Sequence, residues 1–276
     1  LLYSIDKTKT AIGARLLAGR IASPSAIKSE IEDRLDLVSW FLVQNIIKTD
    51  VLSLLKGLPD FERSLARLSL SRGGPRDLLA FATAIVKTEQ ISRLIQQEVS
   101  PSSPAILVNT SKLVAKPYEL SLKIKDALAD DLPLLTRDGH FIRFGFDVKL
   151  DSFRMLSEER KRHIALLQQE YSKETGIASL KIKFNNVLGY HIEVRSIHTD
   201  KIISNDKFIH RQTTAQAARF TTNALADLER ELAAASEKAF AIEISLFDKM
   251  VEEILECRLD IVNCASLIDQ IDVALA

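Results

Sequence analysis

The last 54 residues constrain the fold of this chain more than any other stretch. From Asn223 to Ala276 there is no Gly or Pro, and apolar residues recur in alternating steps of three and four. This seam repeats every seven residues, with one stutter of four-residue steps between Ile242 and Ile254. Its members are Leu225, Leu228, Leu232, Ala235, Ala239, Ile242, Leu246, Met250, Ile254, Cys257, Ile261, Cys264, Ile268, Ile271 and Leu275. At about 1.5 Å per residue, the pattern predicts one helical rod on the order of 75 Å long.

A second long helix is expected a short distance upstream of this one. It runs from about Asp151 to Thr175, with Ile164, Leu167 and Tyr171 at three-four spacing. Gly176 follows at the position that commonly ends a helix. The two helices and the insert between them predict two antiparallel rods with a small module at their far end.

The insert changes from helical spacing to strict alternation of apolar and polar residues. Residues 180–184 and 190–195 alternate, and Asn185–Gly189 between them is typical of a short turn, so an antiparallel hairpin is predicted. Two further strands are expected, one over 208–212 and one near 219–221.

The same alternation predicts how the first strand faces. Lys181 and Lys183 should project together, while Leu180, Ile182 and Phe184 pack against the rest of the chain. Residues 176–223 carry seven basic and three acidic side chains, whereas residues 224–276 carry four basic and twelve acidic ones. A basic module beside an acidic helix favours a surface for a polyanion, and a solvated lysine-rich face fits the same count.

The composition is that of a globular protein, with 276 residues, 46% hydrophobic, 27% charged and a net charge of zero. The stretch before Asp151 is expected to be mostly helical, with Trp40 in the core and a minor hairpin over 136–143. No run of about 18 apolar residues predicts a membrane span. Because the chain starts at Leu1 without Met, we expect a piece of a longer protein.

Motifs that carry catalysis are missing from the sequence. It contains no Gly-x-x-x-x-Gly-Lys-Ser/Thr, no Gly-x-Gly-x-x-Gly and no Gly-x-Ser-x-Gly. His191 and Glu193 have the spacing that opens a zinc-deaminase signature, but its Pro-Cys-x-x-Cys half is absent, so both are expected to face solvent. Cys257 and Cys264 are expected in the core of a protein from a reducing compartment. We therefore predict no enzyme activity, no cofactor and no metal for this chain.

Several motifs, in order along the whole chain, resemble the MutS family of DNA mismatch-repair proteins. The strongest lie in and around the insert: Tyr171–Ile182, Phe184–Val194, Phe208–Thr213 and Ala217–Phe220. Others are Ser4–Leu17, Glu32–Asp36, Leu58–Arg63, Gly74–Leu78, Pro133–Gly139 and Ile271–Ala276. One departure is Thr214–Ala218, where the family commonly has Leu-Lys-Asn-Ala-Glu, so a family lysine is missing at Ala215.

The resemblance implies a mostly α fold, in which two antiparallel lever helices carry a small antiparallel β clamp. The helical core and levers would be residues 1–165 and 224–276, and the clamp would be residues 166–223. By family position, Asn185, Asn186, Arg211 and Gln216 approach DNA phosphates; strand facing and charge add Lys181 and Lys183.

The resemblance also implies partners for the full-length parent. These are mismatched double-stranded DNA, a second MutS subunit in a homodimer and a MutL-type repair protein, with ATP and Mg as cofactors of a DNA-dependent ATPase. The expected location is the bacterial cytoplasm, at the nucleoid. The alternative function is a structural coiled-coil scaffold whose tip binds a protein; it predicts no affinity for duplex DNA.

Overall fold

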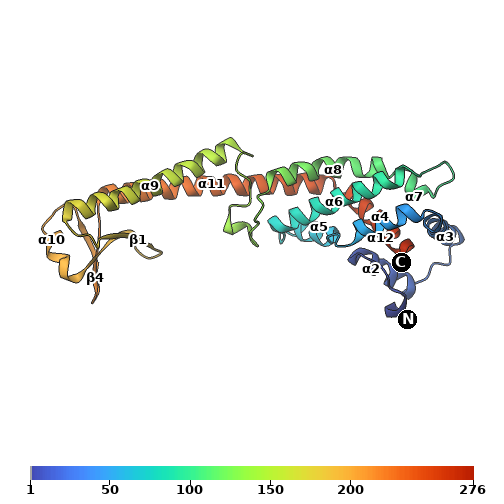
Figure 1. Cartoon of the computed structure of the whole chain (residues 1–276), viewed down its shortest axis with the longest axis horizontal. Helices are drawn as coiled ribbons and strands as arrows, with labels where there is room; N and C mark the ends of the chain where they lie inside the picture. Colours follow the sequence, from blue (N-terminus) through green and yellow to red (C-terminus); the bar gives the residue numbers. More distant parts are fainter. Residues whose placement is uncertain (1) are drawn as a thin grey trace. The chain divides into compact units, whose positions relative to one another are not determined.

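A computed structural model describes residues 2–276, which group into two compact units (Figure 1). The first unit comprises Leu1–Phe146 and Ile244–Ala276, and the second comprises Asp147–Glu243. Most of the described chain is helical, and the second unit holds one small antiparallel sheet. The predicted fold class is confirmed at this level, whereas the predicted domain limits at 165 and 224 stay a prediction.

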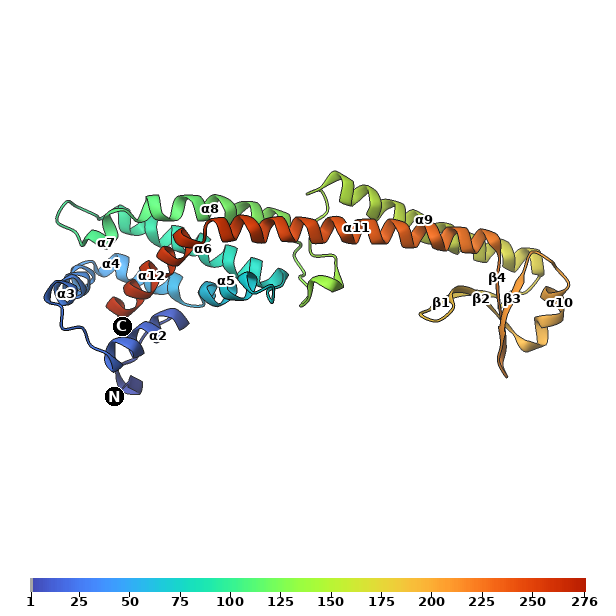
Figure 2. The ribbon, with the colours of Figure 1, turned by 180° about the vertical axis from the view of Figure 1, so that it is seen from behind.

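The first unit is built from helices joined by loops. In chain order they are α1 (Leu2–Ile5), α2 (Ala11–Ala22), α3 (Lys28–Val43), α4 (Asn45–Leu55), α5 (Phe61–Ser69), α6 (Pro75–Gln96), α7 (Ala105–Val108), α8 (Thr110–Ala127), the 3-10 turn η1 (Thr136–Asp138), the end of α11 (Asn223–Glu256) and α12 (Arg258–Leu275). Helix α12 lies among the other helices of this unit (Figure 2) and contacts α2, α3, α4, α5, α6 and α8. Ile261, Cys264, Ile268 and Ile271 on it are fully buried. It is the central helix of this unit.

The predicted continuous rod from Asn223 to Ala276 is wrong, because the helix breaks at Cys257. Helix α11 ends at Glu256 and α12 begins at Arg258, and the backbone at Cys257 has φ −90° and ψ 10°. The Cys257 amide donates to Ile254 O at 3.1 Å, a tighter turn than the α-helix makes. The break turns α12 in among its neighbouring helices (Figures 1 and 2). The sequence has no Gly or Pro at this break. The packing of the neighbouring helices around α12 accounts for it.

The apolar seam of α11 also shifts by one residue from its predicted course. Ile242 and Leu246, predicted on the seam, are half-buried, while Glu243 and Phe247 are 3% and 8% exposed. Three successive four-residue steps, beginning at Ala235, move the buried stripe around the helix. A buried carboxylate needs a partner, and Arg154 Nη2 donates to Glu243 Oε1 at 2.8 Å.

The minor hairpin predicted over 136–143 does not form. Residues Thr136–Asp138 make a 3-10 turn, and His140 has a positive φ of 59°. Ile142 forms an isolated antiparallel bridge with Leu128 instead. The apolar residues of this stretch pack into the core: the Phe141 ring is fully buried, and its centroid lies 5.8 Å from that of Phe247.

No single described helix has both the length and the apolar content to cross a bilayer. The bent pair Lys28–Val43 and Ile46–Leu55, at 110°, meets the criteria of length and composition only.

The second unit contains α9, four strands and the start of α11. Its elements are α9 (Val148–Thr175), β1 (Lys181–Asn185), β2 (Gly189–Arg195), the 3-10 turn η2 (Ser196–His198), α10 (Thr199–Ile203), β3 (Ile209–Thr213), β4 (Ala217–Thr221) and α11 up to Glu243. The sheet order is β1-β2-β4-β3, with every neighbouring pair antiparallel. The predicted hairpin is confirmed as β1 and β2, and the two further strands as β3 and β4.

Local chemistry sets both ends of α9. The Asp147 carboxylate accepts from Leu150 N at 2.8 Å, so the helix begins three residues before its predicted start. Gly176 ends it in the left-handed conformation (φ 67°), as predicted.

Helices α9 and α11 lie side by side and antiparallel within the second unit (Figures 1 and 2). Polar contacts between them pair rising numbers on α9 with falling numbers on α11; they include Arg154–Glu243 at 2.8 Å, Ser157–Ser236 at 3.0 Å and Arg160–Glu231 at 2.8 Å. The predicted buried face of α9 is confirmed, because Ile164 and Tyr171 are buried and Leu167 packs against them.

One hydrophobic cluster joins the sheet of the second unit to this helix pair. It includes Ile192, Val194, Ala218 and Phe220 from the strands, Ile164 and Tyr171 from α9, and Leu225 and Leu232 from α11. The Tyr171 hydroxyl bonds Thr222 Oγ1 at 2.7 Å, and its ring lies 5.2 Å from that of Phe208. Burial raises the pKa of Tyr171, so this hydroxyl stays neutral. One face of the sheet is thereby covered and the other is left to solvent.

Candidate nucleic-acid interface

The strand register decides which side chains share the solvent-facing side of the sheet. Lys181 lies opposite Glu193 and Lys183 opposite His191 in the β1–β2 pair. In the β2–β4 pair, Glu193 lies opposite Arg219. Directly opposed residues point to the same face of a sheet. We call the side that carries Lys181, Lys183, Glu193, Arg195 and Arg219 the open face.

The open face is strongly basic. Its four cationic side chains, Lys181, Lys183, Arg195 and Arg219, surround a single carboxylate. All five line a surface cavity of about 700 Å³, which also includes polar groups of Ser196, Thr214 and Gln216. Cationic groups mixed with hydroxyls and amides are the donors that contact phosphate oxygens.

Glu193 pairs with two of the cations at once. Lys183 Nζ donates to its Oε1 at 2.6 Å, and Arg219 Nε lies 3.4 Å from its Oε2. The hydrogen bond from Lys183 is the main reason that the pKa of Glu193 lies below its usual value. Arg219 also donates from Nη1 to Gln212 Oε1 at 2.8 Å. Glu193 is therefore ionised at neutral pH and held between β1 and β4.

Lys181 and Arg195 are the cations of the open face that stand outside this network. Both are exposed, and neither has an ion-pair or hydrogen-bond partner for its side chain within the described residues 2–276. Arg195 and Arg219 were missed at the sequence level. Alternation along β2 places Arg195 beside Glu193, but only the pairing with β4 reveals that Arg219 joins them.

The predicted contacts Asn185 and Asn186 lie at the β1–β2 turn. Asn185 Oδ1 accepts from Val187 N at 3.0 Å and from Leu188 N at 2.7 Å, so this oxygen shapes the turn. Asn186 is exposed. The turn is fixed to α11, where Glu229 Oε1 accepts from Tyr190 N at 2.9 Å.

The predicted contacts Arg211 and Gln216 lie in the β3–β4 hairpin. Arg211 is exposed and sits in a β-bulge, because the register shifts between His210 and Gln212. Gln216 is exposed in the turn and lines the cavity of the open face. The structure thus brings Lys181, Lys183 and Gln216 together around one cavity, whereas Asn185, Asn186 and Arg211 do not line it.

Two predictions about the exposure of strand residues are wrong. His191 was expected to face solvent but is 2% exposed, and its Nδ1 lies 3.0 Å from Gly189 O. The register pairs it with Lys183, so it lies on the predicted side of β2 but is covered there. Phe184 was expected to pack but is 59% exposed, 5.1 Å from the ring of Tyr190. It sits on the edge strand β1, which has a neighbour on one side only.

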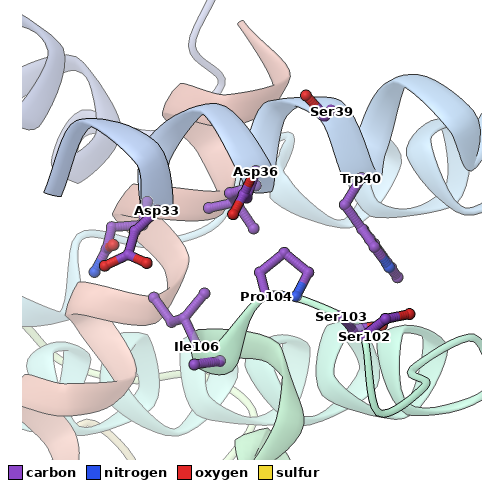
Figure 3. Close-up of a pocket in the computed structure, with 11 residues that line it drawn as sticks. Asp33, Asp36, Ser39, Trp40, Ser102, Ser103, Pro104 and Ile106 are labelled. Carbon is purple, nitrogen blue, oxygen red and sulfur yellow. The ribbon is translucent and has the colours of Figure 1, made fainter. Parts of the chain in front are cut away.

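A cavity of about 560 Å³ in the first unit has the opposite charge character (Figure 3). Asp33 and Asp36 of α3 line it together with Trp40, Ser102 and Ser103, and its lining holds no Lys or Arg. Trp40 was predicted in the core but is half-buried, because the neighbouring Phe41 takes the inward position at 1% exposure. Two carboxylates at this cavity would repel a phosphate chain.

The described residues offer no clear metal site, since no group of three or more His, Cys, Asp or Glu is placed to hold an ion. Cys257 and Cys264 are buried free thiols, in agreement with their predicted place in the core. Burial raises the pKa of Cys264 to about 12, which keeps this thiol protonated and unreactive.

Comparison with known proteins extends over the whole chain. Residues 1–276 match the family model described as MutS domain III. Proteins named DNA mismatch repair protein MutS from Nitrobacter hamburgensis and Bartonella tribocorum are each 40% identical to this chain. The first alignment covers 99% of this chain and the second 100%, and the chain spans 30% of the length of each relative. The chain therefore belongs to the MutS family of DNA mismatch-repair proteins.

Proposed function

We propose that this chain grips the backbone of duplex DNA without reading its sequence, as part of a longer mismatch-repair protein. The clamp would be residues 166–223, and the helical core and levers would be residues 1–165 and 224–276. The observation that carries the proposal is the open face, where four cations surround one carboxylate at a solvent-facing cavity.

Elementary electrostatics supports this assignment. Duplex DNA is a dense line of phosphates, and cations that neutralise them release bound salt ions, which drives sequence-independent binding. Contacts to phosphates position a protein on DNA but carry no sequence information. The proposed contacts are Lys181, Lys183, Asn185, Asn186, Arg211 and Gln216, joined by Arg195 and Arg219 from the open face. Position 215 holds Ala where the family commonly has a lysine. Arg195 and Arg219 supply positive charge at the cavity that Ala215 also lines.

We propose that α9 and α11 act as levers that link this grip to an ATPase region elsewhere in the protein. Their antiparallel contacts, including the Arg154–Glu243 pair, would let them move as one body. The residues of this chain do not fit ATP and Mg: the sequence has no phosphate-binding loop, and residues 2–276 show no cluster of acidic ligands. We assign both cofactors, and the ATPase activity, to parts of the protein beyond this chain.

The partners proposed for the whole protein are those that membership of the MutS family implies. Both are DNA mismatch repair proteins from bacteria. We propose mismatched double-stranded DNA as the substrate, a second MutS subunit and a MutL-type protein as partners, and the cytoplasm as the location.

Duplex binding titrated against salt tests the grip directly. The chain should bind a fluorescein-labelled duplex in an anisotropy assay, with affinity falling linearly in log[salt] at a slope of about −0.9 per neutralised phosphate. The double variant K181A/R195A should weaken binding about equally on every duplex sequence and reduce the slope by about two phosphate equivalents.

The matched control is Lys201→Ala, which removes one exposed cation from α10, outside the open face. It should leave the slope within about half a phosphate equivalent of the parent. Unchanged affinity and slope in K181A/R195A would overturn the assignment of the open face. Absence of duplex binding at low salt, with binding to a protein partner instead, would favour the scaffold alternative.

A further inference from the structure

The cavity of the open face already contains an anion of the protein's own. Glu193 is the only acidic side chain among the described residues that line it, and it lies at the centre of the face, on β2. Lys181 stands opposite it on β1 and Arg219 opposite it on β4. A carboxylate at the middle of this surface would repel the phosphates that the surface is proposed to bind.

The contacts of Glu193 match those that a phosphodiester would make. Its two oxygens share one negative charge, and each faces a different cation: Oε1 accepts from Lys183 Nζ at 2.6 Å, and Oε2 lies 3.4 Å from Arg219 Nε. A phosphodiester also presents two non-bridging oxygens that share one negative charge. Either anion can therefore join the cation from β1 to the cation from β4.

We infer that the open face holds a phosphodiester-binding site and that Glu193 occupies it as an internal anion when no DNA is bound. The incoming phosphate takes Lys183 and Arg219, and the Glu193 carboxylate is left beside it as a like charge. This inference rests on the proposed function, because it takes the phosphodiester from duplex DNA. Glu193 thereby lowers the affinity of the face for DNA.

The exchange is physically accessible because the pairing is at the surface. The side chain of Lys183 is 51% exposed, so its ammonium can swing on a flexible stem from a carboxylate to a phosphate. Exposed ion pairs contribute little net stability, so breaking this pair opposes binding only weakly. The lasting effect is repulsion between Glu193 and the phosphate, which cations on both sides only partly offset.

The first experiment compares two variants with the same change in net charge. Glu193→Gln removes the internal anion, whereas Asp206→Asn removes an exposed carboxylate of the same unit that does not line the cavity. In the anisotropy assay with a labelled duplex at low salt, E193Q should tighten binding by about threefold to tenfold. D206N should tighten it by less than about twofold. Equal gains in the two variants, or no gain in E193Q, would overturn the inference.

The second experiment tests whether Glu193 masks Lys183. Lys183→Gln should weaken duplex binding more in the E193Q background than in the parent, by about threefold, because the lysine is released only when its carboxylate partner is removed. Equal losses in both backgrounds would show that Lys183 is not masked. Thermal unfolding of each variant checks that the sheet remains folded.

The outcomes separate this inference from the proposed function. If the unmutated chain binds duplex DNA and E193Q binds no more tightly than D206N, the internal anion is disproved while the DNA grip stands. A parent that does not bind, with E193Q binding in a salt-dependent way, supports the internal anion. Failure of both proteins to bind at low salt removes the grip and the inference together.

Discussion

Asp272 in the helical unit and Glu193 in the sheet unit are carboxylates with opposite kinds of partner. Asp272 is fully buried and accepts from the backbone amides of Lys9 and Thr10, each at 2.8 Å, and from Thr10 Oγ1 at 2.6 Å. Glu193 is half-buried, and it pairs with the long cationic side chains of Lys183 and Arg219. One anion is held by the fold, and the other is held by groups that can move.

A fold can thus hold one charge rigidly and leave another free to exchange partners. Backbone donors cannot leave without unfolding the segment that carries them, so Asp272 fixes the start of α2 to α12. Lysine and arginine can reorient at little energetic cost when they are exposed to water. A surface for a mobile ligand is therefore expected where carboxylates pair with exposed cations, as they do on the open face.

The largest expected effect is on Asp272. Replacement by Ala leaves two backbone amides and the Thr10 hydroxyl without their acceptor in a buried place, so the free energy of unfolding should fall by about 3 kcal/mol. Urea unfolding followed by circular dichroism measures it. Asp126→Ala, at an exposed position on α8, is the control and should change stability by less than about 0.5 kcal/mol. Equal losses would contradict a fixed structural role for Asp272.

A smaller effect is expected from two glycines that differ in what surrounds them. Gly176 and Gly189 both have positive φ, 67° and 69°, so Ala at either should destabilise by about 1 kcal/mol. A Cβ at Gly189 would also clash with Glu229 Oε1, whereas nothing lies within 4 Å of one at Gly176.

G189A should therefore lose about 1 kcal/mol more than G176A, since it displaces the carboxylate that accepts from Tyr190 N. Thermal unfolding of the two variants measures the difference. Equal losses would mean that the contact with Glu229 does not hold the β1–β2 turn.

Asp269 should make stability depend on pH. Burial raises its pKa from 3.8 to about 7, against weaker opposing effects from Gln270 N, Arg20 and Arg15, while Glu62 raises it further. A raised carboxylate pKa means that the folded state binds the proton more tightly than the unfolded state does. Proton binding at Asp269 therefore contributes fully to the free energy of unfolding below about pH 3.8, and this contribution is lost as pH rises to about 7.

Asp269→Asn should remove that dependence and stabilise the protein at neutral pH by on the order of 1 kcal/mol, after allowance for solvent screening. The gain over the parent should grow between pH 5 and 7, as measured by urea unfolding at each pH. A gain that does not vary with pH would contradict a raised pKa for Asp269.

The smallest expected effect is the response of Glu193 to pH. Lys183 and then Arg219 hold its pKa below the usual 4.5, and Lys181 and Arg195 line the same cavity. Its stabilising contribution is present above that usual value and is lost only as pH falls through the lowered pKa. E193Q should therefore change stability by less than about 1 kcal/mol. Its gain in DNA affinity should be constant from about pH 5.5 to 8. A gain that shrinks toward pH 5.5 would show that Glu193 titrates there.

Much of the fold follows from local pattern. The alternation around Asn185–Gly189 predicts the hairpin β1–β2 within one residue at each strand, and Gly176 predicts the end of α9. Of the candidate contacts, charge and alternation correctly place Lys181 and Lys183 on one exposed side. These are properties of consecutive residues, which the period of a strand or helix converts directly into geometry.

Other features could not be read from the sequence because they depend on segments far apart in the chain. Arg219 joins Lys183 and Glu193 only through the pairing of β2 with β4. The break at Cys257 has no local signal, since α12 is surrounded by helices from the start of the chain. Periodicity fixes which residues share a face, whereas packing decides which face is covered, where a helix must turn and which charges meet.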